Sequence, residues 1–65
     1  MPVINGENVD AAVGKSLSEY LSEAGYDAGR VAVELNLEIV PPEAFAATRL
    51  AEGDSVEIVQ FVQGG

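Results

Sequence analysis

Two glycines end the chain, Gly64 and Gly65, in the stretch QFVQGG that follows an apolar strand-like run. Glycine loses more conformational freedom on folding than any other residue, so a terminal pair of glycines suits motion or tight access better than packing. The α-carboxylate of Gly65 has an ordinary pKa of about 3.3–3.7, so it is ionised and unreactive until a better leaving group is attached. We predict that the chemistry takes place at this chain end.

The reach of the chain end supports the same interpretation. Residues 63–65, when extended, span on the order of 10 Å, which is enough to carry the terminus from the domain into the active site of another protein. Without Cβ atoms, Gly64 and Gly65 can thread a narrow channel in whatever backbone conformation the channel imposes. The alternative is a functionless tail, as at most chain ends.

Composition excludes several classes of function. The chain has 65 residues and neither Cys nor His, so it lacks a thiol nucleophile, the usual zinc ligands and the usual general base. An autonomous enzyme is therefore disfavoured, and we expect no bound cofactor or metal. The formal net charge is −8 at pH 7, which disfavours nucleic acid and anionic membranes as partners. With no membrane-spanning run and no signal-like N-terminus, we expect a cytoplasmic protein.

The N-terminal half predicts a hairpin followed by a helix. Residues 1–4 are expected to be extended, Asn5-Gly6 is the preferred two-residue hairpin turn, and the next strand is expected over residues 7–11. Ser16-Leu17-Ser18-Glu19 has the form of a capping box, so a helix should start at Ser16. Its apolar stripe comprises Leu17, Tyr20, Leu21 and Ala24, and Gly25 is suitably placed to end it.

The C-terminal half predicts three strands. Residues 31–35 alternate as a half-buried strand, and residues 38–40 form another before Pro41-Pro42 ends it. A helical turn is expected from Pro42, with Phe45 and Leu50 in the core. After a turn at residues 52–54, the last strand is expected over residues 55–62. Strands from the two chain ends would then pair in parallel, with one helix on one face. This predicts an α+β β-grasp fold with a mixed sheet of four to five strands.

The last strand carries a second candidate site. Alternation places Val56 and Ile58 toward the helix and Val59 and Phe61 on the opposite face, which one helix cannot cover. The candidate partner-binding residues are Val59, Phe61, Val62 and Gln63. The alternative is that these are ordinary strand residues packed on their neighbours. Glu52, Asp54 and Glu57 could likewise meet basic partner surfaces or simply be solvated, with Asp54 a turn residue.

Three stretches together resemble one family. VAVELNLEIVPPEAF (residues 31–45), LAEGDSVEIVQFVQGG (residues 50–65) and the N-terminal hairpin resemble the sulfur carrier proteins of thiamin biosynthesis, which are ubiquitin-like. The resemblance covers essentially the whole chain, as a single domain over residues 1–62 and a flexible tail over residues 63–65. Two positions depart from the family pattern: Leu37, where Gly or a polar residue is common, and Pro42, where a basic residue is common.

The resemblance implies a protein co-substrate rather than an enzyme. An E1-like adenylyltransferase would use Mg-ATP to adenylate Gly65, and sulfur from a cysteine desulfurase system would replace AMP to leave a thiocarboxylate. Thiazole synthase would then take the sulfur. We expect a monomer when the chain is free. The alternatives are a sulfur carrier of molybdopterin synthesis, a ubiquitin-like protein modifier and an interaction module with an inert tail.

Overall fold

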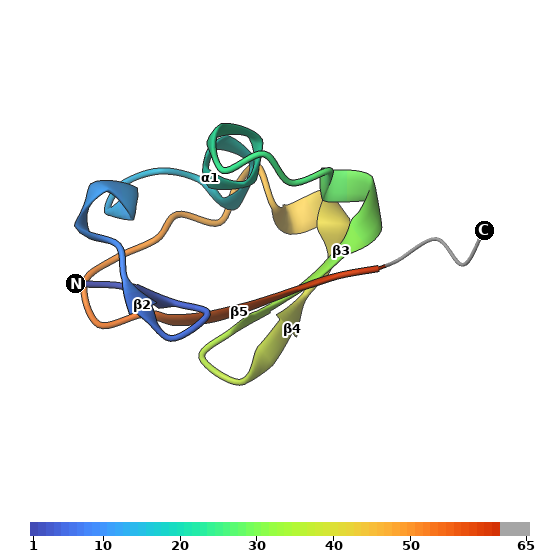
Figure 1. Ribbon diagram of the computed structural model, residues 1–65. Coiled ribbons are helices and arrows are strands. Elements are labelled where there is room, and N and C mark those ends of the chain that lie inside the picture. The colour runs from blue at the N-terminus through green and yellow to red at the C-terminus, as the bar shows by residue number, and fades with distance from the viewer. Residues whose placement is uncertain (62–65) are drawn as a thin grey trace.

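The described part of the chain forms a five-stranded mixed sheet with one α-helix on one side (Figure 1). The computed structural model describes residues 1–61. The strands and helices are β1 (Val3–Ile4), β2 (Glu7–Asn8), η1 (Asp10–Ala12), α1 (Leu17–Glu23), η2 (Ala28–Arg30), β3 (Val31–Leu35), β4 (Glu38–Val40), η3 (Pro42–Ala44) and β5 (Ser55–Gln60), where η marks a 3-10 turn.

The sheet has the strand order β2-β1-β5-β3-β4. The strands from the two chain ends, β1 and β5, pair in parallel, with Ile4 opposite Val56, and every other pairing is antiparallel. The last strand therefore lies at the centre of the sheet. This topology confirms the predicted β-grasp fold, with five strands.

The helix begins where the sequence predicts. Ser16 is the N-cap: its Oγ accepts a hydrogen bond from Glu19 N at 3.1 Å, and Glu19 Oε1 accepts from Ser16 N at 2.9 Å. Gly25, with φ of +87°, follows the C-cap, in the left-handed conformation that favours glycine. Ala24 is exposed rather than part of the buried stripe, because it is the C-cap residue at the end of the helix.

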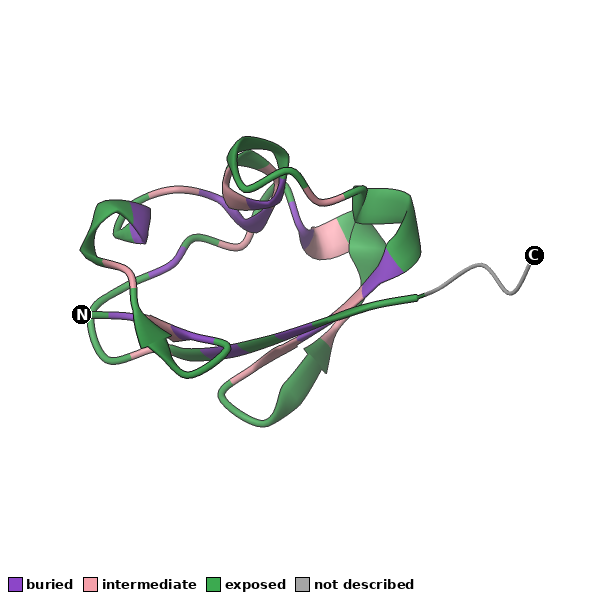
Figure 2. Ribbon diagram, in the orientation of Figure 1, coloured by how far each residue is buried: buried purple, intermediate pink, exposed green. Residues whose placement is uncertain are grey.

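The core lies between α1 and the facing side of the sheet, where the buried positions of Figure 2 gather. Leu17 and Leu21 of α1 are fully buried, and burying one leucine side chain contributes about 1.5–3 kcal/mol. The segment between η3 and β5 adds Phe45 and Leu50, as predicted. The buried hydrophobic residues are Ile4, Ala12, Leu17, Leu21, Val31, Val33, Phe45, Leu50, Val56 and Ile58.

Two predicted strands have different bounds in the structure. The prediction of a strand over residues 7–11 is wrong beyond Asn8: Val9 N still donates to the Pro2 carbonyl, but η1 then turns the chain and buries Ala12 in the core. The last strand was predicted over residues 55–62. It ends at Gln60, and Val62 lies outside the described residues.

Both hairpin turns use residues with positive φ. Asn5 and Gly6 have φ of +51° and +83°, which confirms the predicted turn. The turn between β3 and β4 is of the same kind, at Asn36 and Leu37, with φ of +52° and +70°. Leucine is an unusual residue for this position, because its Cβ makes the left-handed conformation costly.

Candidate functional site

The face of the sheet opposite α1 is uncovered at the C-terminal end of β5 (Figure 1). Val56 and Ile58 point to the core and are buried, so the alternate positions Val59 and Phe61 point away from it. Val59 and Phe61 are each 57% exposed. Figure 2 shows this last described segment as exposed up to residue 61. The predicted exposure of Val59 and Phe61 is therefore confirmed, and their contact with a partner stays a prediction.

The backbone of both residues is held by hydrogen bonds although their side chains are exposed. Val59 lies in the β3–β5 ladder opposite Ala32. Phe61 follows the last residue of β5, but its N–H still donates to the Arg30 carbonyl at 2.8 Å. A partner would thus meet a segment whose backbone is already ordered, so binding would cost little backbone conformational entropy.

A third apolar residue, Ile39 on β4, joins this face. It is 66% exposed, and it stands opposite Glu34 in the β3–β4 ladder. Sequence reasoning missed Ile39, although alternation was a usable signal: Val40 packs toward the core, so its neighbour must point away. We call the hollow lined by Ala32, Val33, Glu34, Ile39, Glu57 and Val59 the sheet-face groove; its volume is about 180 Å³.

The remaining predicted site residues cannot be placed against this groove. Val62, Gln63, Gly64 and Gly65 lie outside the described residues. Phe61, the last described residue, directly follows the central strand β5. The described structure therefore brings together Val59 and Phe61 of the predicted site, and adds Ile39.

The start of β5 is held by side chains of the β3–β4 turn and the turn before β5. Asn36 Oδ1 accepts from Ser55 N at 2.9 Å, and Asn36 Nδ2 donates to Asp54 Oδ1 at 3.1 Å. Asp54 Oδ2 accepts from Ala51 N at 2.8 Å. These bonds make Asp54 a turn residue, which was one of its two predicted roles. Glu52 lies beside the N-terminal ammonium and forms an ion pair with it.

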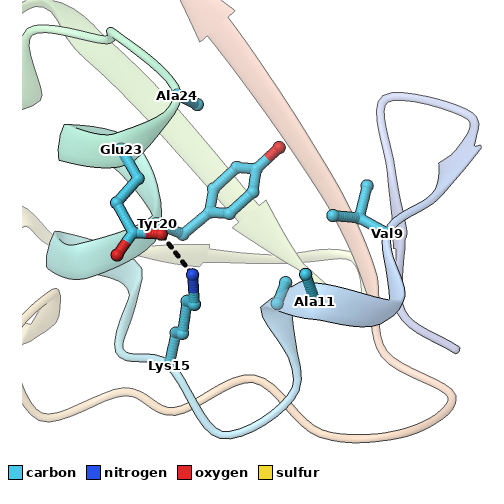
Figure 3. A pocket seen from close by; sticks show the side chains of 7 residues that line it. Val9, Ala11, Lys15, Tyr20, Glu23 and Ala24 are labelled. Atoms are coloured by element: carbon cyan, nitrogen blue, oxygen red, sulfur yellow. Dashed lines mark hydrogen bonds and ion pairs between the residues drawn. The ribbon is translucent and has the colours of Figure 1, made fainter.

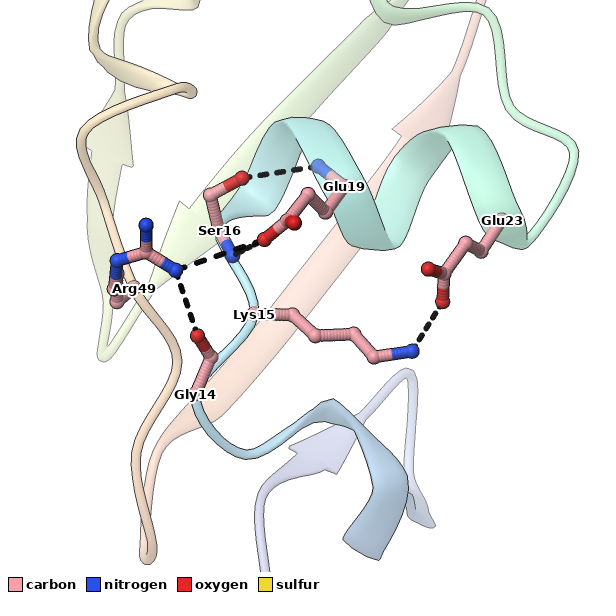
Figure 4. A network of polar contacts seen from close by, with 6 residues as sticks. All are labelled: Gly14, Lys15, Ser16, Glu19, Glu23 and Arg49. Atoms are coloured by element: carbon pink, nitrogen blue, oxygen red, sulfur yellow. Dashed lines mark hydrogen bonds and ion pairs between the residues drawn. The ribbon is translucent and has the colours of Figure 1, made fainter.

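A polar network fixes the start of α1 (Figure 4). Arg49 Nη1 donates to the Gly14 carbonyl at 2.8 Å and lies 3.6 Å from Glu19 Oε1. The hydrogen bond from the Ser16 backbone lowers the pKa of Glu19 below its usual 4.5, and the charge of Arg49 acts in the same direction. The network secures the helix to the segment before β5, on the side of the molecule away from the sheet-face groove.

A second hollow, of about 160 Å³, lies between η1 and α1 (Figure 3). Val9, Ala11 and Tyr20 line it, and the ion pair of Lys15 with Glu23 lies at its margin. Burial raises the pKa of the Tyr20 phenol, and nearby Tyr26 and Glu7 add to the shift. These contacts join the helix to the N-terminal hairpin, which is a structural role.

Residues 1–61 show neither a metal-binding cluster nor a membrane-spanning helix. This part of the chain contains no group of three or more side chains suited to hold a metal ion. None of its helices is long and apolar enough to cross a membrane.

Comparison with known proteins identifies close relatives over the whole fold. A family model described as the ThiS family matches residues 3–65. The crystal structure of the thiamine biosynthesis protein (ThiS) from Geobacter metallireducens aligns with a TM-score of 0.78 and 40% sequence identity, covering 98% of this chain and 97% of that one.

Two relatives are longer proteins. The thiazole synthase of Paramagnetospirillum magneticum is 44% identical over 63 residues, and that of Magnetococcus marinus is 37% identical over 62 residues. The alignments cover 97% and 95% of this chain but 19% of each synthase. The chain thus spans about a fifth of the length of these two relatives.

Proposed function

The chain belongs to the ThiS family, and on that basis we propose that it is a sulfur carrier of thiamin biosynthesis that carries sulfur on the carboxyl group of Gly65. The observation that carries this proposal is the family match over residues 3–65, which includes Gly64 and Gly65. The β-grasp fold supports it, because the ThiS structure from Geobacter metallireducens has the same fold at 40% identity.

The proposed chemistry has two displacement steps. A carboxylate oxygen of Gly65 attacks the α-phosphorus of Mg-ATP in an E1-like adenylyltransferase, pyrophosphate leaves, and an acyl-adenylate forms. Hydrosulfide, which a thiol reductant releases from the persulfide of a cysteine desulfurase system, then attacks the carbonyl carbon, and AMP leaves. The product is a thiocarboxylate. This chain is the co-substrate, and the partner enzymes supply the catalytic groups and the metal.

The sulfur acceptor in this proposal is thiazole synthase. Two relatives with a segment matching this chain are themselves named thiazole synthase, which favours the thiamin pathway over molybdopterin synthesis. Glycine at both terminal positions suits a tail that must enter two different active sites, because it adopts backbone conformations that other residues rarely reach. Both steps belong to the cytoplasm, where ATP and reduced sulfur donors are available.

Intact mass spectrometry tests the proposal directly. The protein, prepared with Gly65 as its last residue, is incubated with the adenylyltransferase, Mg-ATP, a cysteine desulfurase, cysteine and a thiol reductant. We expect a mass gain equal to the replacement of one oxygen by sulfur, located on Gly65 by fragmentation. An unchanged mass with enzymes that are active on another carrier would refute the proposal.

A matched variant tests the role of the chain end without altering the folded domain. One alanine added after Gly65 moves the carboxylate by one residue and leaves residues 1–61 unaltered. We expect this variant to keep the wild-type melting temperature and to lose ATP–pyrophosphate exchange. Unaltered exchange would show that Gly65 is not the group that is activated.

A further inference from the structure

Two carboxylates stand side by side on the uncovered face of the sheet. Glu34 of β3 and Glu57 of β5 are direct partners in the antiparallel ladder, and both line the sheet-face groove. Like charges directly opposite each other on neighbouring strands are destabilising. Within residues 1–61, neither side chain forms an ion pair or a hydrogen bond. The isolated domain therefore gains nothing from this arrangement.

The cations of the chain are engaged elsewhere. Lys15, Arg30 and Arg49 are its only lysine and arginine residues, and they pair with Glu23, Asp27 and Glu19 respectively. The formal net charge of −8 leaves no internal cation to neutralise the two carboxylates of the groove. Neutralisation has to come from outside the chain.

The rest of the groove is apolar. Ala32 and Val59 are cross-strand partners, and Ile39 stands on β4 beside Glu34. A fitting occupant thus combines an apolar stem, to cover Ala32, Ile39 and Val59, with a cationic head that contacts both carboxylates. Arginine has this form: three methylene groups lead to a planar guanidinium that can donate hydrogen bonds to two acceptors at once.

We propose that the sheet-face groove binds an arginine side chain of the adenylyltransferase, with the guanidinium bridging Glu34 and Glu57 and the stem packed on Ile39 and Val59. This inference rests on the proposed function, and it assigns the partner chemistry that docks the domain while the chain end is activated. Desolvation of the carboxylates by the surrounding apolar surface makes such charge-assisted hydrogen bonds stronger than exposed ones.

Two measurements test the inference: the stability of the free protein, which should not fall, and its affinity for the adenylyltransferase, which should fall. Glu34→Gln, Glu57→Gln and the double variant each remove charge and keep the side-chain shape. Because they relieve the repulsion between strands, the melting temperature of the free protein should stay the same or rise. The dissociation constant for the adenylyltransferase, measured by calorimetry, should rise about fivefold for each single variant and more for the double.

Kinetics add a third measurement. In ATP–pyrophosphate exchange, the variants should raise KM for the carrier and leave kcat close to that of the wild type, because the groove docks the domain without touching the reacting carboxylate. Glu43→Gln on η3 is the matched control: it removes the same charge from an exposed position away from the groove, and should alter the dissociation constant far less.

The outcomes separate the two proposals. If Glu34→Gln and Glu57→Gln bind the enzyme as tightly as Glu43→Gln does, the groove inference is wrong, even if the wild type is adenylated normally. If the wild type binds but is not adenylated, the proposed function fails, and the dissociation constants of the variants still decide the role of the groove. If the wild type does not bind the enzyme, both are overturned.

Discussion

Asn5 continues the parallel β1–β5 ladder with its side chain. Its backbone N–H donates to the Val56 carbonyl at 2.9 Å, after which the chain turns away from β5. The side chain then takes over: Oδ1 accepts from Ile58 N at 2.7 Å, and Nδ2 donates to Ile58 O at 3.3 Å. The amide thus mimics one more peptide unit, and Ile58 keeps partners on that side of β5.

Replacing Asn5 with glycine should remove this additional ladder contact. Glycine adopts the positive φ of this position, so the loss is confined to the side chain. With the Ile58 N–H left without its partner, we expect the free energy of unfolding to fall by about 1–2 kcal/mol. Urea denaturation measures the loss, and hydrogen exchange at the Ile58 amide should become faster.

Asn36→Gly is the matched control for that experiment. Asn36 also has a positive φ and also binds a β5 amide, but that amide belongs to Ser55, which is exposed. Water can replace the lost partner there, so Asn36→Gly should lower the free energy of unfolding by less than Asn5→Gly does. Equal losses of unfolding free energy at the two positions would contradict the role assigned to the part-buried contact of Asn5 with Ile58.

Leu37→Gly should stabilise the protein. Leu37 has φ of +70° and is 89% exposed, so it bears the cost of a left-handed conformation and buries almost no apolar surface. After allowing for the greater freedom of glycine in the unfolded chain, we expect the free energy of unfolding, measured by urea denaturation, to rise by about 0.5–1 kcal/mol. Leu37→Ala keeps a Cβ and should show no such gain; equal stabilisation by alanine would refute the explanation.

The charge of Glu19 should make stability depend on pH. Its pKa is lowered in the folded protein by the Ser16 hydrogen bond and by Arg49. The stability that the ionised Glu19 carboxylate contributes is therefore complete above its unfolded-state pKa of 4.5. This stability is lost as the pH falls through the lower folded-state pKa. Glu19→Gln keeps the capping geometry without the charge.

Thermal unfolding of both proteins across this range checks the prediction. The wild type should melt at a higher temperature than Glu19→Gln near neutral pH, and the gap should close as the pH falls below 4.5. A gap that stays constant with pH would mean that the carboxylate charge contributes nothing to the network.

The exposed apolar residues should matter for binding rather than for stability. Val59→Ser removes apolar surface from the uncovered face, and we expect it to weaken binding to the adenylyltransferase about tenfold, which corresponds to about 1.4 kcal/mol. Calorimetry measures the affinity. Val13→Ser, at another partly exposed valine, is the control and should bind like the wild type. Matching losses at both positions would indicate a non-specific effect.

Much of this architecture could be predicted from local sequence signals. The Asn5-Gly6 turn, the capping box at Ser16 and the glycine after α1 each depend on contacts between residues close in the chain, so their residue types indicate them directly. Alternation within β5 likewise placed Val59 and Phe61 opposite the core. The break between strands at Asn36-Leu37 was also placed correctly, but its positive-φ conformation was not predicted, because leucine is rarely found at a positive φ.

The sequence by itself determined the fold class, the element order and the candidate status of Gly64 and Gly65, because hydrophobic period, caps and composition are properties of the chain alone. Only the tertiary structure decided which residues meet across strands. The pairing of Glu34 with Glu57, the place of Ile39 opposite Glu34 and the bond from Asn5 to Ile58 all depend on strand register. Register is set by the packing of the whole core, so segments far apart in the sequence acquire their neighbours only when the sheet forms.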